Sequence, residues 1–229
     1  MKYRMIMLLL LGAFAANVAH AQQGHDAAGE ANEPAPKQPV SPSESDAQDG
    51  QANLVNNPLY ENWARFGVGS FIEQRIVTQS GESEDQVRVT ARLLLESVDK
   101  ERLMLKLSRD VVMATGGERD RVNQPDEQVE VPRLVTQKEA DEYINPPGMT
   151  EQGDDTITVL GKKLKTHWYE IKREDVTGEV VTRVWTNPHV PGLLAKMTIK
   201  SEGLLAFTTE MSITDIQIKE SRHDIFDDE

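Results

Sequence analysis

The sequence predicts a mainly β fold, in which one curved antiparallel sheet of about 8–9 strands forms a half-barrel or open barrel beside two short helices. Residues 86–98 alternate between apolar and polar side chains, which is the period of a strand with one buried face. Short turns rich in glycine, aspartate and asparagine separate similar segments over residues 67–219. Between them there is only short helical patterning, so an antiparallel meander is favoured over a βαβ fold.

The first 21 residues have the pattern of a secretory signal peptide. Lys2 and Arg4 precede an apolar run over residues 5–16, and a small-residue cleavage site ends at Ala21. The run is shorter than the roughly 20 residues of a membrane-spanning helix, which argues against the alternative of a retained anchor. We therefore expect an exported protein, periplasmic or extracellular, that is soluble after cleavage near Ala21-Gln22 and keeps no stable membrane anchor.

The composition excludes several classes of function. The chain has no cysteine, which rules out a disulfide framework, a lipid-modified cysteine, thiolate metal sites and thiol nucleophiles. Its net charge of −13 becomes −15 when Lys2 and Arg4 leave with the signal peptide. Such a surface repels nucleic acid and anionic membrane surfaces, so we expect no nucleic-acid partner.

Three further segments follow the signal peptide. Residues 22–56 are predicted to be a disordered acidic linker, because they are rich in proline, alanine and serine and contain few apolar side chains. Residues 57–219 are expected to form the antiparallel β domain, and residues 220–229 an acidic tail. About 160 residues suffice for one hydrophobic core in one domain.

Order begins with a short helix at Asn57-Pro58. Asparagine is a good N-cap and proline suits the first helical position. Leu59, Trp63 and Phe66 then share one helical face, so we expect Trp63 to fill the core. The next segment, residues 67–70, has the spacing of glycines found in phosphate-binding loops. It leads into a predicted strand and not into a helix, so no helix N-terminus is available to bind a phosphate.

Three local signals add detail to the predicted strands: a proline, a helix start and a change of parity. Pro132 confines its strand to an edge or a bulge. A second helical segment begins at residues 136–139, where Thr136 and Glu139 have capping-box spacing, and it leads into residues 140–144. The apolar positions change parity near Thr214-Asp215, which indicates a bulge. The predicted strands are residues 68–78, 86–98, 103–115, 129–135, 155–160, 164–173, 179–186, 193–200 and 204–219.

No motif identifies a catalytic or metal site. His167 lies in a predicted strand on the same face as Tyr169, and it would need a carboxylate from a neighbouring strand to act as an acid or base. The chain has no His-Glu-x-x-His and no Gly-x-Ser-x-Gly sequence. We expect a structural histidine, no cofactor, no metal and no enzymatic activity. A hydrolase that uses His167 is the third-ranked alternative.

The segment over residues 184–192 reads Val-Trp-Thr-Asn-Pro-His-Val-Pro-Gly and precedes a predicted strand. Together with residues 57–70 and 159–165, it resembles a planctomycete-type family of exported bacterial proteins with a Trp strand and a Val-Pro-Gly hairpin. Leu193 stands where that family usually has a second glycine. The resemblance assigns no activity and no site residue.

A more distant resemblance is to LolA-like periplasmic lipoprotein carriers, whose later strands also place a tryptophan, a proline and a glycine as Trp185, Pro191 and Gly203 stand here. This fold-level likeness implies a curved sheet that cups an apolar cavity under short helices, and it does not by itself transfer a function.

Two functions therefore fit the sequence. The first is a non-catalytic binding protein that holds a lipid or another apolar ligand in the concave face of the sheet. The second is a solid-core interaction or structural module, whose envelope-protein partner docks on an edge strand or on the loop at residues 190–192. The candidate ligand or partner surface consists of Trp63, Phe66, His167, Tyr169, Trp185, Val190 and Pro191.

Overall fold

The computed structural model describes residues 53–81, 85–175, 178–203 and 206–220. In these residues it has two helices, α2 and α3, and eleven strands in two sheets. The elements are β1 (Leu54–Asn56), α2 (Pro58–Ala64), β2 (Phe71–Ser80), β3 (Gln86–Val98), β4 (Arg102–Thr115), β5 (Glu118–Pro132), β6 (Leu134–Thr136), α3 (Gln137–Ile144), β7 (Met149–Val159), β8 (Lys162–Asp175), β9 (Gly178–Thr186), β10 (Leu194–Gly203) and β11 (Phe207–Gln217).

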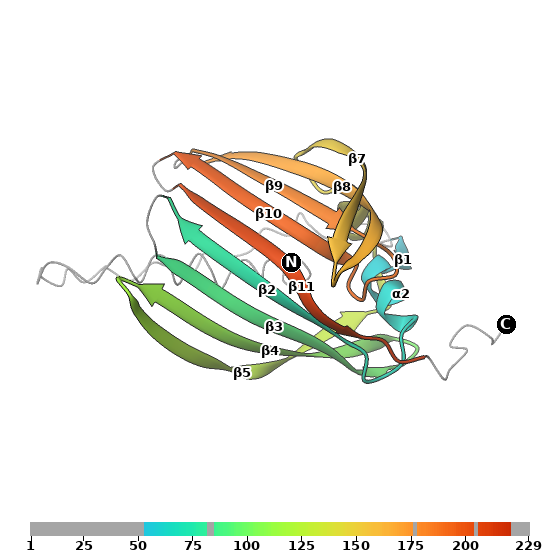
Figure 1. The fold of residues 1–229 in the computed structure, drawn as a ribbon. Coiled ribbons are helices and arrows are strands. Elements are labelled where there is room, and N and C mark those ends of the chain that lie inside the picture. Colours follow the sequence, from blue (N-terminus) through green and yellow to red (C-terminus); the bar gives the residue numbers. More distant parts are fainter. Residues whose placement is uncertain (1–52, 82–84, 176–177, 204–205, 221–229) are drawn as a thin grey trace, which may run out of the picture. The chain divides into compact units, whose positions relative to one another are not determined.

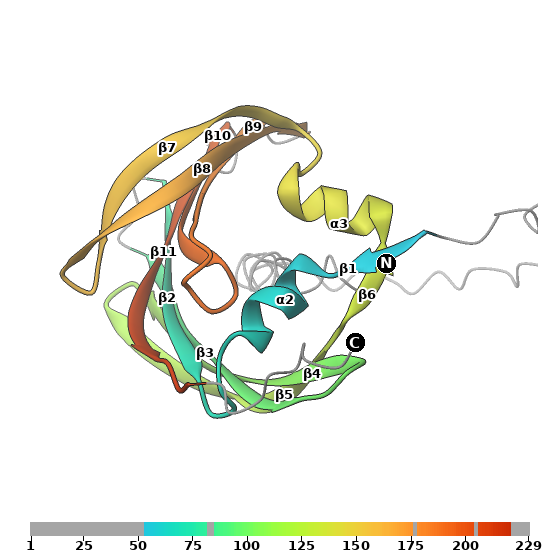
Figure 2. The same ribbon diagram turned by 90° about the vertical axis from the view of Figure 1, so that its right-hand side faces the viewer.

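The main sheet has nine antiparallel strands in the order β5-β4-β3-β2-β11-β10-β9-β8-β7. Because β5 and β7 are its two edges, the sheet is not closed into a barrel. It curves strongly, and α2 lies inside the curve (Figures 1 and 2). The segment β6-α3, which connects the two edge strands, lies across the open side (Figure 2). The predicted curved antiparallel sheet with two short helices is confirmed.

The pleat of the sheet separates an apolar concave face from a polar convex face. Ile76 on β2, for example, lies opposite Val89 on β3 and Met211 on β11, and all three are buried. The neighbouring residues Arg75 and Val77 point to the convex side. Each fully buried aliphatic side chain contributes about 1.5–3 kcal/mol, so this face dominates the core. Its buried apolar residues include Ile72, Ile76, Val89, Ala91, Leu93, Leu95, Leu103, Leu105, Leu107, Val111, Val129, Val131, Tyr169, Ile171, Val184, Ala195, Met197, Ile199, Met211 and Ile213.

The parity change predicted in the last strand is a β-bulge. The register between β11 and β2 shifts between Ile213 and Asp215. After the shift Ile216 pairs with Ile72, so an apolar side chain again meets the concave face. The extra residue bends β11 where the sheet curves around α2.

The charged strand β5 is longer than the sequence predicts. Its first eleven residues, Glu118 to Gln128, carry polar or charged side chains except for Val122 and Pro125, and most of them are exposed. An edge strand with both faces in solvent has no apolar alternation, so its pattern did not identify a strand. Pro132 lies in an edge strand, as predicted, but β5 ends at this residue, and residues 134–136 form the separate strand β6.

The folded part begins before residue 57. Leu54–Asn56, the last part of the predicted linker over residues 22–56, forms β1 and pairs with β6. At the other end Glu220, the first residue of the predicted tail, forms a bridge with Phe66. Both boundaries are therefore corrected by a few residues. The predicted signal peptide, the linker up to residue 52 and residues 221–229 lie outside the described part of the chain.

The glycine-rich segment after α2 joins the two ends of the fold. The Gly67 amide donates to the Lys219 carbonyl at 2.7 Å, and a Cβ on Gly67 would lie 2.2 Å from the Glu220 carbonyl oxygen. Only glycine permits this approach, so the segment serves strand pairing.

Candidate functional site: the concave face and helix α2

Helix α2 is buried on almost all sides. Asn57 caps it, because its Oδ1 accepts a hydrogen bond from the Leu59 amide at 3.0 Å, and Pro58 occupies the first position, as predicted. The same Asn57 side chain donates through Nδ2 to the Pro132 carbonyl at 2.9 Å. Since Trp63 is only 1% exposed, α2 acts as an internal plug and not as a surface helix.

The Asn62 side chain connects α2 to the loop between β9 and β10. Its Nδ2 donates to the Pro188 carbonyl at 2.9 Å, and its Oδ1 accepts from the Gly192 amide at 2.7 Å. The loop passes close to the helix, because a Cβ on Gly192 would lie 3.4 Å from Trp63 Nε1. One asparagine thus fixes both ends of the Val-Pro-Gly turn against α2.

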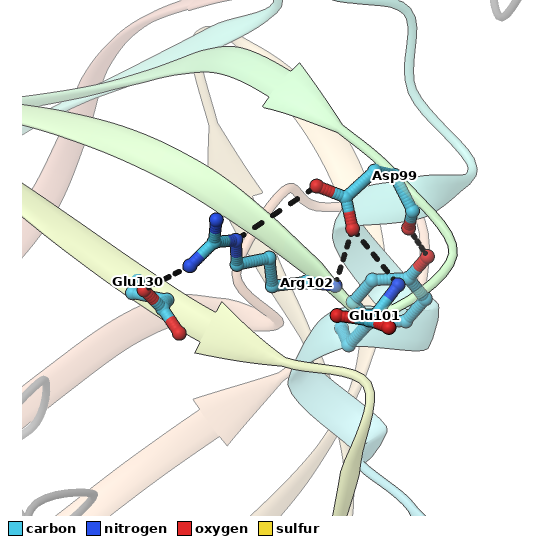
Figure 3. Close-up of polar contacts among 5 residues, drawn as sticks. Asp99, Glu101, Arg102 and Glu130 are labelled. Atoms are coloured by element: carbon cyan, nitrogen blue, oxygen red, sulfur yellow. Dashed lines mark hydrogen bonds and ion pairs between the residues drawn. The ribbon is translucent and has the colours of Figure 1, made fainter.

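Tyr60 connects α2 to the turn between β3 and β4. Its hydroxyl donates to the Asp99 carbonyl at 2.5 Å, and burial raises its pKa. Figure 3 shows the turn itself, where Asp99 Oδ1 accepts from the amides of Glu101 at 2.8 Å and Arg102 at 2.9 Å. Together with Asn57 and Asn62, Tyr60 completes three side-chain attachments of α2, which we call the α2 anchors.

The Asp99 turn is expected to loosen in acid. The backbone hydrogen bonds from Glu101 and Arg102 hold the pKa of Asp99 below its ordinary value of 3.8. Because the folded-state pKa is depressed, the stabilisation is present above pH 3.8 and is lost as the pH falls through the folded-state pKa. The difference in unfolding free energy between the wild type and Asp99→Ala, measured in urea at pH 6 and pH 3, should therefore shrink at pH 3. An equal difference at both pH values would contradict this; Asp120→Ala, at an exposed site of β5, is the control.

Three polar side chains on the concave face are incompletely paired. Gln74 Oε1, Arg109 Nε and Ser201 Oγ are buried and have no hydrogen-bond partner among the described residues. Each lies on the same side of its strand as the apolar core residues two positions away, such as Ile76, Leu107 and Ile199. These three residues were not among the predicted site residues, although each is a polar residue at an apolar position of an alternating strand.

Four of the seven predicted site residues lie at α2 or in its loop. Trp63 and Phe66 contact each other edge to face, with ring centroids 6.4 Å apart. Val190 and Pro191 are buried within the loop that Asn62 holds. Tyr169 lies apart from them on the concave face, where burial raises its pKa to about 12. These five side chains thus belong to the interior of the curved sheet.

His167 lies near the β7 edge and is open to solvent. Its Nδ1 is 3.2 Å from Asp154 Oδ1, and its Nε2 is 3.3 Å from Gln152 Oε1. The side chains of His167 and Asp154 are 48% and 93% exposed. The two groups that its ring contacts are a carboxylate and an amide, so these contacts present no nucleophilic hydroxyl to the histidine.

Trp185 lies on the opposite, convex face. It pairs across strands with Trp168, and its Nε1 donates to Asp155 Oδ2 at 3.1 Å. Lys196 Nζ lies 5.0 Å from the centroid of its ring, and the Arg183 guanidinium lies 4.3 Å from that of Trp168. The structure therefore does not bring Trp185 together with the residues around α2.

The described residues contain no cluster of three or more histidine, aspartate or glutamate side chains placed to hold a metal ion. Neither of the two helices in that part of the chain is long and apolar enough to span a bilayer.

The sequence matches no protein-family model and no curated protein. The solved structures that are similar to the chain include the following three. A DUF1329 family protein from Desulfovibrio piger is 9% identical, covers 75% of this chain and 98% of its own, and has a TM-score of 0.27. A putative outer membrane lipoprotein-sorting protein domain from Vibrio parahaemolyticus is 7% identical, with coverages of 73% and 93% and a TM-score of 0.25.

The LolA superfamily protein NE2245 from Nitrosomonas europaea is 8% identical, with coverages of 76% and 98% and a TM-score of 0.25. Two of these similar structures, the lipoprotein-sorting protein domain and NE2245, have names that match the group to which the sequence suggested a distant resemblance.

Proposed function

We propose that this protein is an exported, non-catalytic binding protein that holds a lipid or another apolar molecule against the concave face of its sheet. One observation carries the proposal. An apolar face that curves around α2 retains buried polar atoms of Gln74, Arg109 and Ser201 without partners. Buried polar groups in folded proteins are nearly always paired, and unpaired ones call for a bound molecule or water.

If the concave face packed as a solid core without a ligand, its unpaired polar groups would lower the stability of the fold. Each unpaired buried group costs about 1–3 kcal/mol, and an apolar residue at the same position would avoid that cost. A ligand with a polar end supplies the missing partners and covers apolar surface at the same time. This favours ligand binding over a solid-core module.

Helix α2 is the element best suited to admit a ligand. It belongs to neither sheet and is attached through the α2 anchors to the end of β5 and to two turns. Its departure would break these hydrogen bonds and expose the buried Leu59, Tyr60 and Trp63, but it would leave the strand pairs of the main sheet intact. Docking of a partner on the loop at residues 190–192 is less favoured, because Val190 and Pro191 are already buried.

Native mass spectrometry of the exported protein, purified without detergent from cells that express the full chain, tests the proposal. We expect additional mass that disappears on organic extraction, and the extracted protein should bind the neutral apolar dye N-phenyl-1-naphthylamine. A bare mass together with no dye binding would overturn the proposal and favour a solid-core module.

A matched pair of variants localises the binding. Val89→Phe takes up space on the concave face, whereas Val77→Phe adds the same ring type on the convex face of the neighbouring strand. Only Val89→Phe should lower dye affinity. Since overpacking costs about 1–3 kcal/mol, the fold of both variants is checked by circular dichroism.

A further inference from the structure

Arg109 places a cation on the apolar face. It lies opposite Ala91 on β3, and Ala91 lies opposite Gln74 on β2, so all three point to the concave side. The neighbours of Arg109 on the same side of β4 are Leu107 and Val111, both buried. A guanidinium in such surroundings loses hydration and must recover it through hydrogen bonds.

The protein supplies only part of that recovery. Arg109 Nη2 donates to Glu127 Oε2 at 2.8 Å, and the Arg109 side chain is 13% exposed. Its Nε is buried and has no partner. A guanidinium carries five N–H donors, and its usual contact with a carboxylate uses two of them in parallel. Arg109 therefore keeps at least one donor, its Nε–H, without a partner among the described residues, and it lies on the concave side of β4.

We propose that Arg109 binds the anionic headgroup, a carboxylate or a phosphate, of an amphiphile whose apolar chain lies on the concave face. This rests on the proposed function and adds the chemistry of the ligand's polar end. Surplus donors require an acceptor-rich group, and a guanidinium fits planar or tetrahedral oxyanions. The acidic surface does not prevent this, since at short range and low dielectric the local cation outweighs distant, screened charges.

Glu127 makes the assignment testable from both sides. It is 32% exposed and competes with an anionic headgroup for the same guanidinium. Removing its charge frees Arg109, whereas removing Arg109 leaves Glu127 to repel an anion. Opposite effects of the two substitutions on anion binding would be unexpected for an ion pair that only stabilises the sheet.

The experiment measures displacement of N-phenyl-1-naphthylamine from the extracted full-chain export product by dodecanoate, dodecyl phosphate and 1-dodecanol, which share one chain length. We expect the wild type to bind whichever of the two anions has the higher affinity at least tenfold more tightly than it binds the alcohol. This ratio of affinities is the quantity compared between variants. Arg109→Gln should reduce this ratio to near one and leave the affinity for the alcohol unchanged. Glu127→Gln should raise the ratio. Arg92→Gln, on the convex face over Phe71, should not change it.

Each outcome separates the two proposals. If neither the dye nor any amphiphile binds, the proposed function fails and this inference fails with it. If the alcohol binds as tightly as the anions, the proposed function stands, and water rather than a headgroup fills the site. If the anions are preferred but neither Arg109→Gln nor Glu127→Gln changes the ratio, the assignment to Arg109 is wrong.

If Arg109→Gln does not fold, the test rests on Glu127→Gln, which should raise the ratio; an unchanged ratio in that variant would contradict the assignment. The two anions distinguish a carboxylate from a phosphate headgroup.

Discussion

Replacement of Trp63 by alanine is expected to lower the free energy of unfolding by about 3–5 kcal/mol, which is the usual cost of deleting a buried aromatic side chain. Trp63 is 1% exposed and packs edge to face against Phe66. Gly192 also lies close to the Trp63 ring, since a Cβ there would be 3.4 Å from Nε1. The loss would leave a cavity between α2 and the loop that Asn62 fixes.

Urea unfolding followed by far-UV circular dichroism measures this effect without relying on tryptophan fluorescence. Trp168→Ala is the matched control, because Trp168 lies half-buried on the convex face over Gly153. Trp168→Ala should lower the free energy of unfolding by clearly less than Trp63→Ala does. If Trp63→Ala destabilised the protein no more than Trp168→Ala, α2 would not be an internal plug.

Replacement of Asn62 by alanine is expected to cost about 2–4 kcal/mol, because it removes two hydrogen bonds and leaves the Pro188 carbonyl and the Gly192 amide without their partner. No other described residue bonds both ends of this turn through one side chain. Chemical denaturation of the variant gives the free-energy change directly.

Asn56→Ala is the control for this second substitution. The Asn56 side chain makes one hydrogen bond, to the Glu61 side chain at 2.9 Å, and this bond is exposed, unlike the two that Asn62 makes. Exchange with water compensates for its loss, so the expected cost is below about 1 kcal/mol. Equal costs for the two asparagines would show that the attachment of the turn to α2 contributes little.

Much of the fold could be predicted because local chemistry and tertiary structure agree. The caps at Asn57 and Thr136 depend on side chains within three residues, and both helices begin as predicted. The alternation in residues 86–98 reflects one buried face, which β3 has. The polar half of β5 escaped prediction because an edge strand buries little of either face.

The candidate site was predicted only in part. Trp63, Phe66, Val190 and Pro191 come together around α2, since large apolar side chains near a turn tend to enter the core. Trp185 lies on the other face of the sheet from them, which could not be predicted because strand parity alone does not tell which of two faces is the concave one. Gln74 and Arg109 occupy apolar positions of alternating strands, but only the structure shows that Gln74 Oε1 and Arg109 Nε are buried without a partner.

By itself, the sequence determined the fold class, the two helix starts and the bulge in the last strand, because each depends on propensities and periods within about ten residues. Only the tertiary structure decided that β11 pairs with β2, that α2 lies inside the curve and that Arg109 lies in one row with Ala91 and Gln74 on the concave face. These features depend on contacts between residues far apart in the chain. A local pattern specifies which side chains are buried, but not against which partners they are buried.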